Sequence, residues 1–265
     1  MRDSVQLSIE QFINAWRLMC GPSPRYASAS SDDIALVFSG LPIGFFNVGV
    51  VTGRGVTADR LATAARTACA WAGTQKVPWL FVTTHEALDS GADATSTLDA
   101  LGLAPIMPLT GMRAPSLVPG APLPDGLQFT TPADDESCEL ITAINSKAYG
   151  MELDGANPVL GRTAFWRDQF PVVAIASGSP ASCAAVMMVD GHRYVALVAT
   201  EPAHQRRGYA EAAMRRALAD AAAVHGEKPT ALHATEAGRP VYERMGYRTI
   251  ANHTVFMEKR FLEEH

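Results

Sequence analysis

A strand end, a proline-containing turn and a helix start follow one another in Val198-Ala-Thr-Glu-Pro-Ala-His-Gln-Arg-Arg-Gly-Tyr-Ala210. The first turn of a helix presents backbone N–H groups without intrahelical partners, together with a partial positive charge. Gly208 lets a ligand approach the main chain closely, and Ala210 keeps this first turn free of bulk. The pattern therefore predicts a binding loop between a strand and a helix.

The side chains of this loop favour an anionic ligand. Gln205, Arg206 and Arg207 add hydrogen-bond donors and positive charge to a chain whose formal net charge is −5. Donors of this kind at a helix start suit a pyrophosphate. The residues alone leave open an ordinary strand-to-helix turn with solvated arginines.

Strands and helices alternate on both sides of the loop. We expect strands at 127–131, 171–176, 183–189, 194–200 and 230–234, and helices at 134–148, 208–225 and 237–245. Residues 247–259 read as two closing strands separated by a break at Asn252-His253. The helix at 208–225 has one apolar side, and Gly226 marks its end.

The spacing Gln205-x-x-Gly208-x-Ala210 resembles the [Gln/Arg]-x-x-Gly-x-[Gly/Ala] signature of the GNAT superfamily of acyl-CoA-dependent N-acyltransferases. Further along, Thr235-Glu-Ala-Gly-Arg-Pro-Val-Tyr242-Glu-Arg-Met-Gly246-Tyr247 looks like the second motif of that superfamily. The resemblance covers about residues 127–261. It implies an α+β fold with a mixed α/β sheet, in which two GNAT-like units in tandem each have a mostly antiparallel central sheet flanked by helices.

Residues 112–126 contain four prolines and two glycines, which exclude a regular helix or central strand. We therefore expect a linker at 112–126 between a degenerate GNAT-like domain at 1–111 and a catalytic GNAT domain at 127–265. From the strand, turn and long helix onward, the first half repeats the order of elements of the second. It lacks the phosphate signature, because the corresponding junction reads Thr52-Gly-Arg-Gly-Val-Thr57.

The resemblance implies that the second half binds acetyl-CoA as co-substrate. The strand end at Val198, Ala199 and Thr200 would pair with the pantetheine arm, and a freed N–H there would hold the thioester oxygen. The implied pyrophosphate site comprises Gln205, Arg206, Arg207, Gly208, Tyr209 and Ala210. Many relatives carry Asn where this chain has Thr235, so one polar contact to the cofactor arm or substrate is expected to change.

The resemblance also implies that Tyr242 faces the sulfur and protonates the departing thiolate. The ordinary pKa of tyrosine, about 10, keeps it protonated at neutral pH. A partly buried core tyrosine is the alternative. No carboxylate lies within 194–200, so Glu201 is the nearest candidate for a general base, although it also suits a solvated turn. His233 reads better as a structural histidine than as a base, and ordered water stays open as the route for the proton.

Composition limits the other function classes. Twenty-two basic against 27 acidic residues argue against nucleic acid and anionic membranes as partners. The four cysteines lie far apart, so we expect neither a disulfide framework nor a metal site. The uncharged segment 34–53 is interrupted by Pro42 and by three glycines, which favours two buried strands over a membrane span. With no recognisable leader, we expect a cytoplasmic protein.

These observations predict an N-acetyltransferase in which a primary amine attacks acetyl-CoA directly. The acceptor is a small-molecule or peptide amine, expected in a cleft formed by 151–166 and the inter-domain surface. The competing hypothesis is a non-catalytic acyl-CoA-binding regulatory module. Acceptor identity and acyl length stay open, as does the choice between a monomer and a homodimer.

Overall fold

The structure of the protein is a computed structural model that describes residues 3–262. Its residues divide into two compact units. The first comprises the chain up to Met112 together with His233–Arg239 and the residues from Thr249 onward. The second comprises Arg113–Leu232 and Pro240–Arg248. Each unit is described below by itself.

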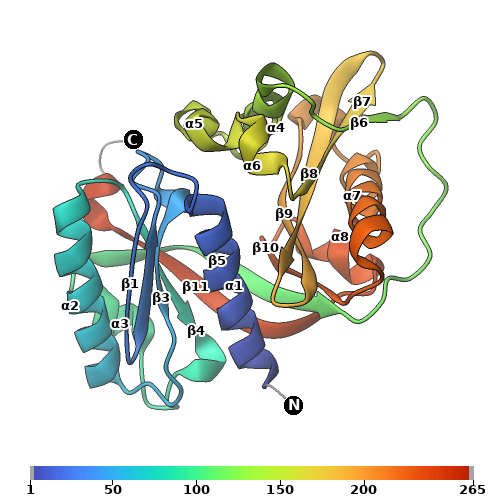
Figure 1. The fold of residues 1–265 in the computed structure, drawn as a ribbon. Coiled ribbons are helices and arrows are strands. Elements are labelled where there is room, and N and C mark those ends of the chain that lie inside the picture. Colours follow the sequence, from blue (N-terminus) through green and yellow to red (C-terminus); the bar gives the residue numbers. More distant parts are fainter. Residues whose placement is uncertain (1–2, 263–265) are drawn as a thin grey trace. The chain divides into compact units, whose positions relative to one another are not determined.

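The first unit is a mixed sheet with helices on its two faces (Figure 1). Its strand order is β1-β2-β3-β4-β11-β5. Only β3 and β4 pair in parallel among the ladders β1–β2, β2–β3, β3–β4 and β4–β11 of the described residues. The strands are β1 (Ala27–Ser31), β2 (Ile34–Phe38), β3 (Asn47–Val51), β4 (Leu80–Thr84), β5 (Leu103–Ala114) and β11 (Arg248–Glu258), and the helices are α1 (Ser4–Cys20), α2 (Ala58–Gln75) and α3 (Ala94–Asp99).

The core of the first unit forms where α2 packs against the strands. Ala65 and Ala68 of α2 belong to one buried cluster with Leu36, Trp79 and Phe256, which come from β2, the start of β4 and β11. Alanines let the helix approach the sheet closely, so large strand side chains fill the space between them. A residue from the far end of the sequence thus completes this core.

The second unit has the strand order β10-β9-β8-β7-β6, in which β10 and β9 are parallel and the remaining neighbours antiparallel. Helices α4 and α7 contact the central strands from opposite faces (Figure 1). The strands are β6 (Gln128–Thr130), β7 (Phe170–Ala176), β8 (Ser179–Val189), β9 (His192–Thr200) and β10 (Thr230–Ala234), and the helices are α4 (Asp135–Tyr149), α5 (Asn157–Leu160), α6 (Thr163–Trp166), α7 (Tyr209–His225) and α8 (Arg239–Arg244). The last two residues of β10 and the first residue of α8 belong to the first unit. Short 3-10 turns lie at Gly44–Phe46, His85–Ala87, Asp154–Ala156, Pro202–His204 and Lys259–Phe261.

Local sequence explains where the main helices of the second unit begin. Asp134 accepts a hydrogen bond from the Ser137 N–H, and the Ser137 hydroxyl group accepts one from the Asp134 N–H, so a capping box starts α4. Helix α7 starts instead at Gly208, which has a left-handed φ of 79° and no side-chain cap. The start of α7 therefore leaves its first N–H groups available.

The expected mixed α/β fold is confirmed, but two details of the end of the chain differ. The predicted break at Asn252-His253 was wrong, because Arg248–Glu258 is one strand. Both the N–H and the amide of Asn252 donate to Glu86, and His253 pairs with Thr84 in the ladder with β4. This pairing also places β11 with the first unit, whereas the sequence assigned it to the second domain. The division into domains at 1–111 and 127–265, with a linker at 112–126, stays a prediction.

Candidate functional site

Strands β9 and β10 of the second unit share a short ladder. In the described part of the chain it joins Thr230 to Arg193 and Ala231 to Tyr194, whereas β9 continues to Thr200. Val198, Ala199 and Thr200, predicted to bind the pantetheine arm, all lie in this continuation. The structure therefore places them on the last part of β9, beyond its pairing with β10.

The end of β9 contains a bulge that the sequence did not indicate. The register with β8 shifts between Cys183 and Ala185, and Leu197 has a left-handed φ of 53°. A left-handed residue other than glycine costs roughly 1–2 kcal/mol, so its surroundings must hold it in place. The carbonyl group of Leu197 accepts hydrogen bonds from the Asn145 amide and the Cys183 thiol, each at 3.4 Å.

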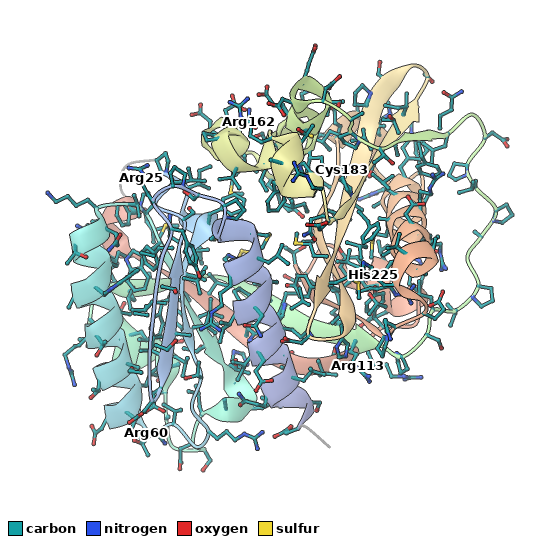
Figure 2. All side chains as sticks on the ribbon, in the orientation of Figure 1. Arg25, Arg60, Arg113, Arg162, Cys183 and His225 are labelled. Atoms are coloured by element: carbon teal, nitrogen blue, oxygen red, sulfur yellow. The ribbon has the colours of Figure 1, made fainter. Side chains whose placement is uncertain are left out.

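Two side chains hold this bulge from within the core. Asn145, on α4, is 3% exposed, and its amide also donates to the Ile141 carbonyl at 2.8 Å and the Cys183 sulfur at 3.2 Å. Cys183 lies on β8 (Figure 2). Burial raises the pKa of its thiol to about 12, so it stays protonated and acts as a donor and not as a nucleophile.

Tyr149, the last residue of α4, is a further contact that sequence reasoning missed. Its hydroxyl group donates to the Val198 carbonyl at 2.9 Å. It lies four residues after Asn145, so both side chains leave the same side of α4. No sequence signal marks Tyr149, because an exposed tyrosine at a helix end is compatible with many roles.

The start of α7 has an irregular backbone. Arg206 and Gly208 both have left-handed φ values, 62° and 79°. The first hydrogen bond of the helix runs from the Ala212 N–H to the Gly208 carbonyl. The N–H groups of the residues before Ala212 therefore have no carbonyl partner within the helix. Successive N–H groups in such a turn form a concave site for an anion. The side chains of Gln205, Arg206 and Arg207 are exposed beside it, so these residues fit a diphosphate.

Tyr242 lies on α8 and is 8% exposed. Its ring centroid lies 6.0 Å from that of Tyr247, whose hydroxyl group is hydrogen-bonded to Thr230 at 2.7 Å. Burial raises the pKa of Tyr242 above its ordinary value, and the neighbouring Tyr149 and Tyr247 raise it further. Tyr242 is therefore protonated at neutral pH and able to donate. Its catalytic role stays a prediction, because its burial also suits a core tyrosine.

Two other predicted residues are engaged in local contacts. The carboxylate of Glu201 forms an ion pair with the Lys147 ammonium group at 2.7 Å, and its side chain is 18% exposed. Accepting a proton would therefore compete with this pair. The hydroxyl group of Thr235 accepts a hydrogen bond from the Gly238 N–H at 3.3 Å, which closes the turn before α8.

His233, considered as an alternative base, is held in a network of the first unit. Its Nε2 lies 3.0 Å from the Ser8 hydroxyl group, and its ring meets Phe12 edge to face. Burial and the nearby His253 lower the pKa of His233 well below its ordinary value. A neutral, weakly basic ring in such contacts suits a structural histidine.

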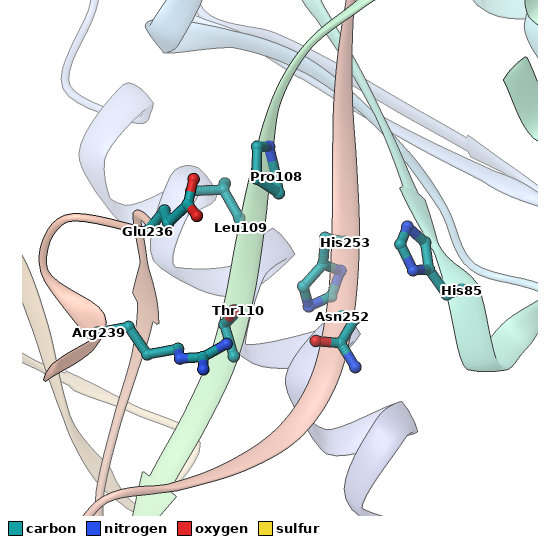
Figure 3. Close-up of a pocket in the computed structure, with 8 residues that line it drawn as sticks. All are labelled: His85, Pro108, Leu109, Thr110, Glu236, Arg239, Asn252 and His253. Atoms are coloured by element: carbon teal, nitrogen blue, oxygen red, sulfur yellow. The ribbon is translucent and has the colours of Figure 1, made fainter. Parts of the chain in front are cut away.

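A separate cavity of about 200 Å³ lies in the first unit (Figure 3). Its lining residues are His85, Pro108, Leu109, Thr110, Glu236, Arg239, Asn252 and His253. Several of its polar groups bond to neighbours: the Asn252 amide to Glu86 and His85 to Thr254, while His253 contacts both Ser8 and Thr84. These bonds fix the wall of the cavity.

Residues 3–262 contain no group of three or more His, Cys, Asp or Glu side chains that could hold a metal ion. None of the helices within that range is both long enough and apolar enough to cross a membrane.

Part of this chain matches a family model, and several solved structures share its fold. Residues 163–263 match the family model described as Acetyltransferase (GNAT) domain. A GCN5-related N-acetyltransferase from Kribbella flavida is 20% identical, with 97% of this chain and 96% of that chain covered and a TM-score of 0.70. One from Sphaerobacter thermophilus is 14% identical, with 94% and 91% covered and a TM-score of 0.59. A tandem GNAT protein from the clavulanic acid biosynthesis pathway is 15% identical, with 95% and 94% covered and a TM-score of 0.51.

A comparison with curated proteins found no match for the sequence. The family match and the shared fold confirm the resemblance to the GNAT superfamily that the two motifs indicated. The matched segment contains the end of β9, the start of α7 and Tyr242. The proposed degeneracy of the first half stays a prediction.

Proposed function

We propose that this protein is an N-acetyltransferase that moves the acetyl group of acetyl-CoA to a primary amine. The observation that carries the proposal is the match of residues 163–263 to the GNAT acetyltransferase family, because that segment includes every motif residue predicted from the sequence. The backbone at the start of α7 supports it independently, since two left-handed residues and three exposed donor side chains suit a diphosphate.

The proposed binding of acetyl-CoA uses two neighbouring parts of the second unit. Residues 205–210 would hold the diphosphate through their N–H groups and the side chains of Gln205, Arg206 and Arg207. The end of β9, from Val198 to Thr200, would pair with the pantetheine arm. Thr235 follows β10, and its hydroxyl group already closes a local turn, so its contact with the cofactor arm would be weaker.

The proposed reaction is a direct transfer. The amine nitrogen, in its neutral form, attacks the thioester carbonyl carbon, so that a C–N bond forms and the C–S bond breaks. The electron pair of the C–S bond goes to sulfur, and Tyr242 donates its proton to the resulting thiolate. The proton lost by the amine restores Tyr242, through Glu201 or ordered water. Tyr242 is protonated at neutral pH, as a proton donor must be, and because its raised pKa makes it a weak acid the proton is transferred as the C–S bond breaks.

The acceptor is proposed to be a small-molecule or peptide amine, which becomes a cation when protonated. The acidic balance of the chain, with a net charge of −5, favours such a ligand in general terms. The fold leaves the individual acceptor undetermined, since members of one fold differ in the chemistry of their sites.

The decisive experiment measures binding and turnover separately. Calorimetry with CoA and acetyl-CoA should show binding, and thiol release over a panel of amino acids, polyamines, aminoglycosides and peptides should show turnover with at least one amine. Binding without turnover on the whole panel would favour the regulatory module instead. Absence of binding would overturn both functions.

A further inference from the structure

Two consecutive carbonyl groups of β9 are held by side chains that leave α4. The Leu197 carbonyl accepts from Asn145, and the Val198 carbonyl accepts from Tyr149. In a regular strand, successive carbonyl groups point in opposite directions. Here the left-handed conformation of Leu197 turns the chain so that donors on a single helix reach both.

The same contacts fix the direction of the N–H group of Val198. The peptide that joins Leu197 to Val198 is planar and trans, so its N–H points opposite to its carbonyl group. Because the carbonyl of Leu197 is turned toward Asn145, the N–H of Val198 is turned away from Asn145. Helix α4 contacts β8 and β9 from one face, and α7 contacts them from the other.

The bulge depends on these donors, because leucine does not favour a left-handed backbone. Asn145 and Cys183 are buried, and their hydrogen bonds to Leu197 and to each other leave the amide little freedom to move. Tyr149 is 48% exposed, and its hydroxyl group bonds to the residue that follows the bulge. Tyr149 is therefore the support that can be altered without disturbing the core.

We propose that Tyr149 is a positioning residue for acyl transfer: with Asn145 and Cys183 it holds the Leu197–Val198 bulge so that the Val198 N–H is presented to the thioester oxygen. This inference rests on the proposed function. As negative charge develops on that oxygen, a donor held in place stabilises it more than a donor that must reorient. Loss of the Tyr149 hydroxyl group should then lower turnover more than cofactor binding.

The test compares Tyr149→Phe with wild type in two measurements. The infrared band of the thioester carbonyl in bound [1-¹³C]acetyl-CoA should lie at a lower frequency than in free acetyl-CoA, and Tyr149→Phe should return it toward the free value. With an acceptor amine, kcat should fall about tenfold while KM for acetyl-CoA stays within about twofold. Phenylalanine keeps the ring, so the helix end retains its packing.

Thr142→Val is the matched control. Thr142 lies on α4 and donates to Glu139 and Asn157, not to β9. Its loss should leave both the carbonyl band and kcat at wild-type values. An unchanged band and kcat in Tyr149→Phe, or equal losses in both variants, would overturn the inference while leaving the acyltransferase function intact. Failure of wild type to turn over any amine would overturn the proposed function and with it the role of Tyr149 in transfer, whereas a carbonyl band that still depends on Tyr149 would support its positioning of the Val198 N–H toward the bound thioester.

Discussion

Tyr242 combines burial with a hydroxyl group whose proton is held tightly. Tyr149 and Tyr247 both approach it, and together with burial they raise its pKa. The raised pKa keeps Tyr242 protonated at neutral pH, but it also makes the phenol a weaker acid than the thiol of ordinary pKa about 8.5 that it would form, so the proton must move as the C–S bond breaks. Removing the hydroxyl group of Tyr242 therefore tests whether this tyrosine is catalytic or only part of the core.

Tyr242→Phe should lower kcat by about 100-fold while the Kd for CoA stays within about twofold, because only the proton donor is lost. Steady-state thiol release and calorimetry measure the two quantities. Tyr247→Phe is the control, since it removes a buried hydroxyl group that bonds to Thr230 and should cost about 1 kcal/mol of stability with little change in kcat. Full activity in Tyr242→Phe would contradict the proposed proton donation.

His253 should make the stability of the protein depend on pH. Burial lowers its pKa from 6.5 to about 4; the nearby Glu86 opposes this shift, and His85 adds to it. Ser8, Thr84 and His233 also lie against the ring. Between about pH 4 and 6.5 the unfolded chain thus binds more protons, so the contribution is complete above pH 6.5 and is lost as the pH falls.

The loss should reach about 3 kcal/mol of unfolding free energy at most, from the size of the pKa shift. Urea unfolding of wild type and His253→Asn at several pH values between 4 and 7.5 measures it. The variant should show a smaller decrease in unfolding free energy over this interval. Equal pH dependence of the two proteins would show that His253 does not carry the effect.

The turn at the start of α7 has a left-handed backbone at Arg206 and Gly208. The side chains of Gln205, Arg206 and Arg207 are exposed beside this turn. The rest of α7 carries further arginines on its surface, such as Arg216, which pairs with Asp220 at 2.9 Å. Position at the helix start, and not charge alone, should therefore decide the affinity for CoA.

Arg206→Glu should raise the Kd for CoA at least tenfold, because it places a carboxylate where the diphosphate would lie. Arg216→Glu makes the same change of charge within α7, away from its start, and should alter the Kd less than twofold. Calorimetry at fixed ionic strength measures both, since surface electrostatics depend on salt. Equal effects of the two substitutions on the Kd would show that the loop attracts CoA only through its overall charge and does not form a specific diphosphate site.

The sequence predicted the elements around this turn because their patterns are local. Gly208 and Gly226 mark the two ends of α7, and β9 and β10 are short runs of mostly apolar residues. The bulge at Leu197 escaped prediction, because leucine has no preference for a left-handed backbone and its stabilising donors come from distant segments. Tyr149 was missed for the same reason. The break predicted at Asn252-His253 was wrong, because these polar residues, which usually mark a turn, lie within β11 and bond to Glu86 and Thr84.

For the whole molecule, the pairing of β11 with β4 limits how the chain can be divided. His253–Met257 pair with Leu80–Thr84, and Val255 and Phe256 of β11 are buried. Exposing each such side chain costs about 1.5–3 kcal/mol. The predicted domain at 127–265 would carry this strand without its partner.

The fragment 127–265 should therefore be poorly soluble or unfold without cooperativity when produced alone. Co-expression with the fragment 1–126, which contains β4, should restore a soluble complex. Size-exclusion chromatography and urea unfolding monitored by circular dichroism test this outcome. Cooperative unfolding of the isolated fragment would instead support the domain boundaries predicted from the sequence.

The late position of β11 also governs the order of events during translation. Strand β4 leaves the ribosome long before β11 is synthesised, so the β4 edge that β11 will occupy stays open while residues 85–247 are made. An open strand edge is a template for unwanted association. The nascent polypeptide must keep that edge unoccupied until β11 emerges, so the first unit completes its sheet only after Glu258 has left the ribosome.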